Sequence, residues 1–130
     1  MGDMPISPES VAHIRLTVCD IDRSRAFYER VFGWPVVDGV PPEFLHGGVL
    51  YRMDHGMLGL RPAATDRFDE NRVGLDHLAF RVASLAELQA AAAHLDDCGV
   101  AHEPIKDIGV SYILEFRDPD NIALELVAAK

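Results

Sequence analysis

The chain has 130 residues, 48% of them hydrophobic, and this length and composition favour one globular domain and exclude an intrinsically disordered chain. With 21 acidic and 12 basic residues the net charge is −9, so electrostatic repulsion argues against nucleic acid or an anionic membrane as a partner. Cys19 and Cys98 form no disulfide framework, and no segment has the pattern of a signal peptide or a membrane span. We therefore expect a cytoplasmic protein.

The first half of the chain predicts a βαβββ series of elements after a mobile arm at residues 1–11. HIRLTV, residues 13–18, alternates apolar and polar side chains as a strand does, and the acidic residues that follow suit a helix N-terminus. The helix is expected to end at Gly33, because glycine readily adopts the conformation of a C-cap. The remaining elements are a short strand at 34–39, a loop at 41–47 and a hairpin at 47–62 that turns at 54–56.

A charged segment without apolar periodicity, residues 64–73, is expected to connect this half to a second series of the same kind. GLDHLAFRV, residues 74–82, predicts a strand, and the stretch rich in Ala and Leu after it predicts a helix that ends at Gly99. The remaining elements are a short strand at 101–106 and a hairpin at 109–128 that turns at 118–121.

The two halves also match residue by residue, which indicates an internal repeat. The matching segments are 13–18 with 77–82, and 57–60 with 123–126. We therefore expect an α+β fold in which a single domain at 12–130 contains two tandem βαβββ modules. The modules span about 12–63 and 74–128, and pseudo-two-fold symmetry relates them.

Side chains alternate between the two faces of a strand, and this alternation sorts the candidate functional residues. The apolar faces should pack against the helices, so the opposite faces are the place for a site. His13 and His77 occupy the same slot in the two modules, and Glu125 shares their face. Two imidazoles and a carboxylate suit a divalent metal and leave positions open for water or substrate. A lone strand histidine is more often structural, but the repeated placement favours metal binding by His13, His77 and Glu125.

Three motifs give the chain a family resemblance that covers about residues 12–127. They are HIRLTVCDIDRSRAFYERVFGW at 13–34, GLDHLAFRV at 74–82 and FRDPDNIALEL at 116–126. In these motifs the chain resembles the vicinal oxygen chelate superfamily, which includes glyoxalase I, extradiol dioxygenases, fosfomycin-resistance enzymes and bleomycin-resistance proteins. The resemblance implies that the two modules curl into an open, cupped, barrel-like sheet around a central cleft.

The resemblance also implies that metal ligands come from the first and last strands of each module. By position these are His13, Gly59, His77 and Glu125. Gly59 departs from the glyoxalase pattern because glycine has no side chain to offer. The remaining set resembles the two-histidine, one-carboxylate set of the dioxygenase and fosfomycin-resistance branches.

The chemistry that this set implies starts with a substrate that chelates a divalent ion through two adjacent oxygens. The ion, Fe, Mn, Zn or Ni, would act as a Lewis acid and stabilise charge that develops on oxygen. The expected activity is that of a metal-dependent lyase, dioxygenase or transferase. The ligand set does not select the metal.

Other residues are candidates for substrate binding or catalysis. Arg15 and Arg81 share the predicted site face and would either hold an anionic substrate or pair with acidic neighbours. Tyr112 would either exchange a proton with the substrate or pack as strand tyrosines commonly do. Glu125 is a second catalytic candidate, and Gly59 is grouped with the substrate-binding residues.

Two readings without catalysis remain open. One is a protein that sequesters an antibiotic or an aromatic natural product, as bleomycin-resistance relatives do. The other is an interaction module that has lost its ion. In each case we expect a homodimer, because modules of this kind pair either within one chain or between two chains.

Overall fold

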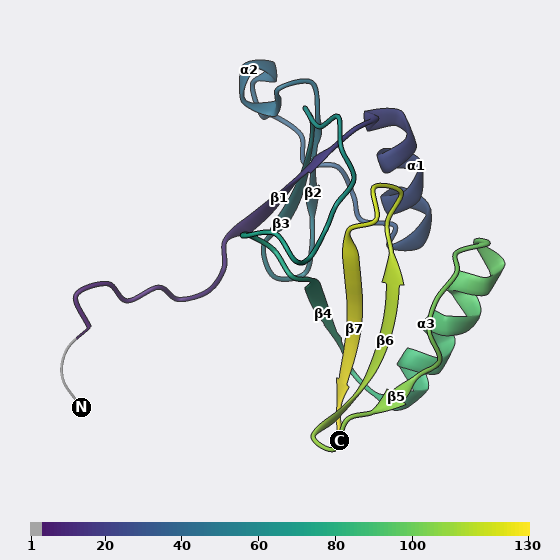
Figure 1. Cartoon of the computed structure of the whole chain (residues 1–130). Coiled ribbons are helices and arrows are strands. Elements are labelled where there is room, and N and C mark those ends of the chain that lie inside the picture. Colours follow the sequence, from purple (N-terminus) through teal and green to yellow (C-terminus); the bar gives the residue numbers. More distant parts are fainter. Residues whose placement is uncertain (1–3) are drawn as a thin grey trace.

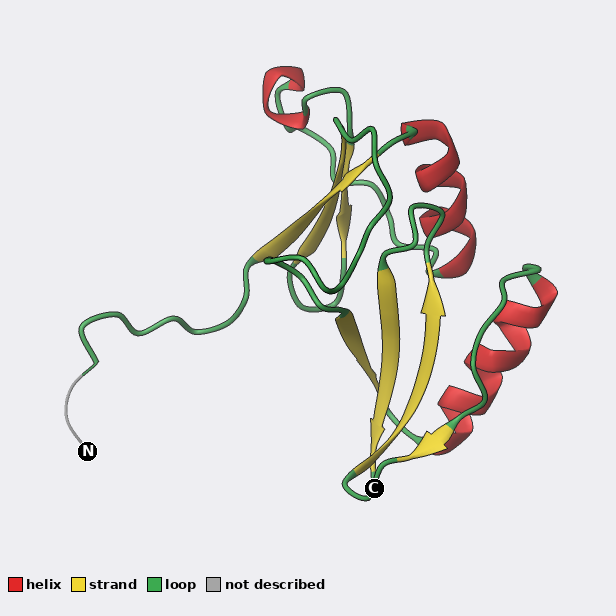
Figure 2. Cartoon of the chain, in the orientation of Figure 1, coloured by secondary structure: helices red, strands yellow, loops and turns green. Residues whose placement is uncertain are grey.

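The computed structural model describes residues 4–130 and divides them between two β-sheets, each with a long helix beside it (Figures 1 and 2). Residues 1–3 of the predicted arm lie outside the described residues, and residues 4–12 run away from the body as an exposed segment (Figure 1). None of the helices in residues 4–130 is long and apolar enough to cross a membrane.

The first sheet has the strand order β1-β3-β2, with β1 parallel to β3 and β2 antiparallel to β3. Its elements are β1 (His13–Val18), α1 (Ile21–Val31), the short α2 (Pro42–Leu45), β2 (Val49–Arg52) and β3 (Met57–Pro62). The side chain of Asp20 caps α1 by accepting a hydrogen bond from the amide of Arg23 at 3.0 Å, as expected for an acidic N-cap. The predicted turn of the β2–β3 hairpin is confirmed, because the amide of Met53 bonds the carbonyl of Gly56 at 3.0 Å.

The second sheet has the order β4-β7-β6-β5, with β4 parallel to β7 and the other pairs antiparallel. Its elements are β4 (Leu78–Val82), α3 (Leu85–Asp97), β5 (Lys106–Asp107), β6 (Ser111–Arg117) and β7 (Ala123–Ala129). Asn121 takes a positive φ of 69° in the β6–β7 turn, a conformation that asparagine tolerates better than most residues.

The register confirms the predicted repeat. Ile14 pairs with Leu58 in the first sheet, and Leu78 pairs with Leu124 at the equivalent point of the second. The fold class is therefore the predicted one, an α+β fold of two βαβββ-like modules whose mixed sheets do not close into a barrel.

The structure differs from the sequence prediction in the short elements. The strand predicted at 34–39 is reduced to a single bridge between Val36 and Tyr51, and the segment at 101–106 forms one bridge, from His102 to Phe116, before β5. The loop predicted at 41–47 contains α2, which begins with a proline at the first helical position, where the missing amide costs nothing.

The two modules pack through α1 and the apolar face of the second sheet. Phe32 at the end of α1 stacks on Trp34 at 4.2 Å and contacts Phe80 of β4 at 5.2 Å between ring centroids. Tyr28 of α1 is buried and donates a hydrogen bond of 2.8 Å to Asp118 in the β6–β7 turn. The faces that carry the predicted ligands therefore point away from this contact.

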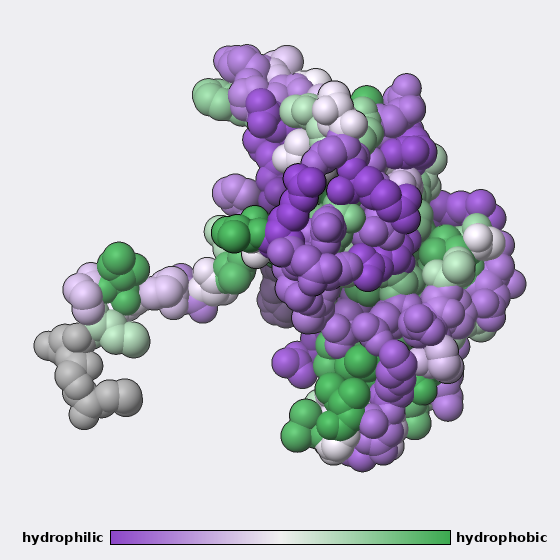
Figure 3. Space-filling view, viewed as in Figure 1, coloured by the Kyte–Doolittle hydropathy of each residue, from purple (hydrophilic) through white to green (hydrophobic). Residues whose placement is uncertain are grey.

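The face of the molecule seen in Figure 3 is mostly hydrophilic. Ile108 and Val110, between β5 and β6, are among the exposed large hydrophobic residues.

Candidate metal centre

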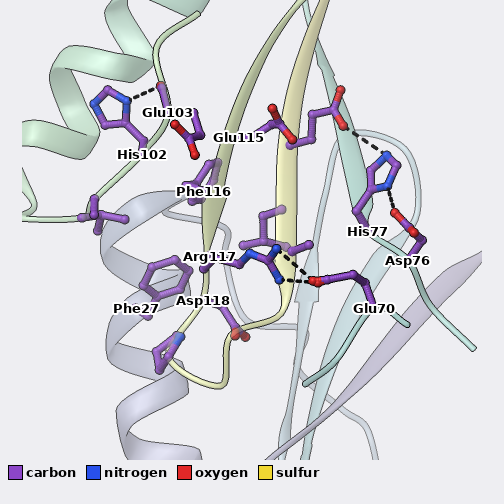
Figure 4. Close-up of a pocket in the computed structure, with 16 residues that line it drawn as sticks. Phe27, Glu70, Asp76, His77, His102, Glu103, Glu115, Phe116, Arg117 and Asp118 are labelled. Atoms are coloured by element: carbon purple, nitrogen blue, oxygen red, sulfur yellow. Dashed lines mark hydrogen bonds and ion pairs between the residues drawn. The ribbon is translucent and has the colours of Figure 1, made fainter. Parts of the chain in front are cut away.

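Glu125 and His77 lie together on the face of the second sheet opposite to the core. Glu125 is central in β7 and pairs with Ala79 of β4, so His77, two residues before Ala79, shares its face. His77 Nε2 is 3.1 Å from Glu125 Oε2, a contact drawn as a dashed line in Figure 4. The side chain of Glu125 is 13% exposed and that of His77 is 46% exposed, which leaves the imidazole open to solvent on one side.

Asp76 fixes the orientation of the His77 ring. Its Oδ1 lies 2.7 Å from His77 Nδ1 (Figure 4), and because a carboxylate can only accept, Nδ1 carries the proton of this hydrogen bond. This hydrogen bond and the negative charge of Glu125 raise the pKa of His77, since each favours the imidazolium. The sequence prediction missed Asp76, although an acidic residue directly before a candidate ligand was a usable signal.

The contact between His77 and Glu125 fits a shared metal ion. Ligand atoms about 2.1 Å from one ion and separated by the angles of a tetrahedral or octahedral site lie roughly 3.0–3.4 Å apart. The observed 3.1 Å falls in this range. One imidazole nitrogen and one carboxylate oxygen are two of the three protein ligands of a two-histidine, one-carboxylate metal site.

The structure does not bring His13 to this pair within one chain. Among residues 4–130, no group of three or more His, Cys, Asp or Glu side chains is placed to hold a metal ion. His13 is exposed at the start of β1, on the face of the first sheet that bears Arg15. The physical reason is the packing of the modules through α1, which keeps the two ligand faces from closing on each other.

Tyr112, the other predicted catalytic residue, lies on a different face from Glu125. Glu115 pairs directly with Glu125, so the odd-numbered side chains of β6 share the ligand face. Tyr112 therefore points to the opposite, core-packed face, where Lys130 Nζ lies 5.2 Å from the centre of its ring.

The three predicted substrate-binding residues lie on the ligand faces. Arg15 and Gly59 pair across β1 and β3, and the Arg15 side chain passes over the glycine. Arg81 pairs with Val127, further along the sheet from Glu125, and is exposed.

A cavity of about 720 Å³ opens beside His77 and Glu125 (Figure 4). Arg117 crosses part of it and binds Glu70 of the connector through two contacts of 3.0 and 3.2 Å. This arginine lowers the pKa of the Glu70 carboxyl by favouring its charged form. Glu115, paired to Lys106 at 2.9 Å, forms another wall. The sequence prediction named none of these residues, because the register that pairs Glu115 with Glu125 was not part of it.

The comparisons with known proteins agree with this architecture. The family model described as the glyoxalase/bleomycin resistance protein/dioxygenase superfamily matches residues 10–126, almost the whole chain. The chain belongs to this superfamily. The superfamily, as its description states, contains glyoxalases, dioxygenases and resistance proteins.

Three relatives illustrate the superfamily match. Protein YwkD of Bacillus subtilis strain 168 is 30% identical over 129 residues, covering 91% of this chain and 95% of YwkD. The glyoxylase/bleomycin resistance protein/dioxygenase domain from Frankia sp. EAN1pec is 34% identical, with a TM-score of 0.81 over 95% of this chain and 94% of that one. FosX, a fosfomycin resistance protein from Listeria monocytogenes, shares the fold at 20% identity, with a TM-score of 0.75 over 95% of each chain. That structure is of a FosX mutant in complex with Mn(II) and 1S,2S-dihydroxypropylphosphonic acid.

Proposed function

We propose that this superfamily member is a metal-dependent enzyme whose ion is held by His77 and Glu125 of one chain and by His13 of a second copy. The observation that carries the proposal is the 3.1 Å contact between His77 Nε2 and Glu125 Oε2 on an open sheet face. The Asp76 carboxylate supports it, because a ring held at Nδ1 presents Nε2 to an ion in a fixed direction.

The need for a second copy follows from the packing within one chain. His13 and His77 hold equivalent slots of the two modules, yet each slot lies on a face turned away from the contact between modules. A homodimer that joins the first ligand face of one chain to the second ligand face of another would complete two identical sites.

A divalent ion at this site would supply Lewis-acid polarisation of a substrate that offers two adjacent oxygens. The residues of the chain do the remaining work. Asp76 holds the proton at His77 Nδ1, so Nε2 is the ring nitrogen that would bind the ion in place of a proton. Glu125 has two oxygens, of which one serves as a ligand and the other accepts a proton from the substrate. The cavity of 720 Å³ admits a small molecule.

The proposed reaction is that of a lyase, dioxygenase or transferase, and the ion is Fe, Mn, Zn or Ni. Two imidazoles and one carboxylate suit each of these ions. The finding of Mn(II) in FosX makes manganese the first ion to test.

The proposal is tested by titration of metal-free protein with Mn²⁺, with isothermal calorimetry and elemental analysis as readouts. We expect one ion per chain and a loss of affinity of about 100-fold or more in Glu125→Ala, since a ligand is removed. Glu115→Ala is the matched control, because it removes an acid directly opposite Glu125 that pairs with Lys106 instead. Full metal affinity in Glu125→Ala, or equal losses in both variants, would contradict the proposed ligand set.

Sequestration of an antibiotic or an aromatic natural product is the second candidate, favoured by the size of the cavity. Cavities of roughly 300–1,000 Å³ bind drug-sized ligands. A sequestering protein would bind such a ligand equally well before and after treatment with EDTA, whereas an enzyme of the proposed kind would lose binding of a chelating substrate.

A further inference from the structure

The two modules place a large and a small side chain at equivalent points, but in opposite order. In the second module, β7 contributes Glu125 and β4 contributes Ala79, which pairs with it. In the first module, β3 contributes Gly59 and β1 contributes Arg15, which pairs with it. In the second module this position on the sheet carries the acidic side chain of Glu125. In the first module the equivalent position, Gly59, has no side chain, and the basic side chain of Arg15 from the neighbouring strand lies over it.

The Arg15 side chain occupies the volume that a ligand at position 59 would need. A Cβ added to Gly59 would lie 3.2 Å from Arg15 Nε, 3.5 Å from Arg15 Cγ and 3.3 Å from Leu50 Cδ1. The contacts with Arg15 Nε and Leu50 Cδ1 are closer than ordinary van der Waals separation. A carboxylate at this position would displace the guanidinium group, so Gly59 allows Arg15 to lie across the sheet.

The charge of Arg15 is not used within the chain. Among residues 4–130, no carboxylate lies within ion-pair distance of its guanidinium, whereas Arg117 on the other ligand face is bound by Glu70. Arg15 is exposed, and it stands two residues after His13 on the same face of β1. Such residues are about 7 Å apart along a strand, within reach of an arginine side chain.

We propose that Arg15 is the anion-binding residue of the metal site and that the substrate is a small anion whose charged group lies next to a second oxygen. This inference rests on the proposed function, in which His13 is a ligand. An α-hydroxy or α-keto carboxylate and a hydroxyalkyl phosphonate share this chemistry. The guanidinium fork pairs with two oxygens of either anion.

The test compares three probes of similar size on the Mn²⁺-loaded protein. Glycolate and hydroxymethylphosphonate are anions, and glycolamide is the neutral counterpart of glycolate. The readout is the displacement of water from Mn²⁺, measured by proton relaxation, which requires no catalytic activity. The variants are Arg15→Met and Arg15→Lys, with Arg67→Met in the connector as the matched control.

We expect Arg15→Met to weaken glycolate or hydroxymethylphosphonate at least about tenfold, as loss of a charge-assisted pair does. The affinities for glycolamide and Mn²⁺ should change less than about threefold, and Arg15→Lys should fall between, because a point charge replaces a fork. If only the affinity for glycolate falls, the substrate class is the carboxylates. If only the affinity for hydroxymethylphosphonate falls, it is the phosphonates.

Equal weakening of glycolate and glycolamide in Arg15→Met would overturn the inference, as would unchanged glycolate and hydroxymethylphosphonate affinities. Loss of Mn²⁺ or of the dimer in this variant alone would also overturn it, because Arg15 would then support the assembly. Failure of the unaltered protein to take up Mn²⁺ would instead reject the proposed function on which the inference rests.

Discussion

The two modules share strand order and register, yet their hairpins meet the rest of the molecule in different ways. The β2–β3 turn, at residues 54–56, is largely exposed, whereas the β6–β7 turn buries the carboxylates of Asp118 and Asp120 against α1. Asp118 accepts hydrogen bonds from Tyr28, and Asp120 pairs with Arg23 at 2.8 Å. The two turns are equivalent in the repeat but have different structural roles, because only the β6–β7 turn packs against the other module.

The largest expected effect is a loss of stability when the buried carboxylate of Asp118 is removed from the β6–β7 turn. Asp118 Oδ1 accepts from the amides of Asp120 and Ile122, each at 2.8 Å, and Oδ2 accepts from Tyr28. Asp118→Ala leaves these buried donors without partners and should lower the free energy of unfolding by about 3 kcal/mol. Urea denaturation followed by the fluorescence of the single tryptophan, Trp34, measures the loss.

Two controls sharpen the comparison of the turns. Asp118→Asn keeps an oxygen acceptor for the amides and should lose only about 1 kcal/mol. Asp54→Ala, in the exposed turn of the first module, should change stability by less than about 0.5 kcal/mol. A similar loss in Asp54→Ala and Asp118→Ala would show that the two turns do not differ as described.

A smaller effect is expected at the bridge that precedes each hairpin, where the first module has Val36 and the second has His102. His102 Nδ1 lies 2.8 Å from the carbonyl of Glu103, and Nε2 lies 2.8 Å from Asp96. The carbonyl of Glu103 has the larger effect and the carboxylate of Asp96 the smaller one. Both favour the imidazolium and therefore raise the pKa of His102. The resulting stabilisation is fully present below the ordinary histidine pKa of about 6.5 and is lost as pH rises through the raised value.

The variant His102→Val places at the bridge of the second module the residue type, valine, that Val36 provides at the bridge of the first. Its stability deficit relative to the unaltered protein should be larger at pH 5.5 than at pH 8.5, by about 0.5 kcal/mol, the size typical of partly exposed ion pairs. Thermal unfolding across this pH range measures the difference, with His55→Val in the exposed turn as the control. A deficit that grows toward pH 8.5 would reverse the predicted sign.

The repeat made much of the fold predictable from the sequence. Alternation in 13–18 and 77–82 predicted which side chains share a face, and the matched segments 57–60 and 123–126 occupy equivalent strands of the two sheets. Short elements were less predictable: a single bridge at Val36 depends on its partner Tyr51 rather than on a local pattern.

The site was predictable only in part. The position of His77 beside Glu125 follows from period-two alternation in two strands that pair, whereas the face on which Tyr112 lies depends on the exact register of β6 on β7. The position of His13 relative to the other two ligands depends on how modules assemble, and no periodicity in one sequence encodes that arrangement. The partners of Arg117 and Asp76 are set by side-chain conformations in the folded chain.

The central proposal, a site that two chains share, is tested most directly by mixing two defective chains. His13→Ala and Glu125→Ala each leave every site of their own homodimer without a ligand, but a mixed dimer pairs the His77 and Glu125 of one chain with the His13 of the other. We predict that denaturing and refolding the two variants together restores Mn²⁺ binding, at one ion per mixed dimer. The double variant mixed with unaltered chains should instead give mixed dimers that bind none. The contradicting result is the reverse: no ion in the first mixed dimer and one in the second, which would place all three ligands in a single chain.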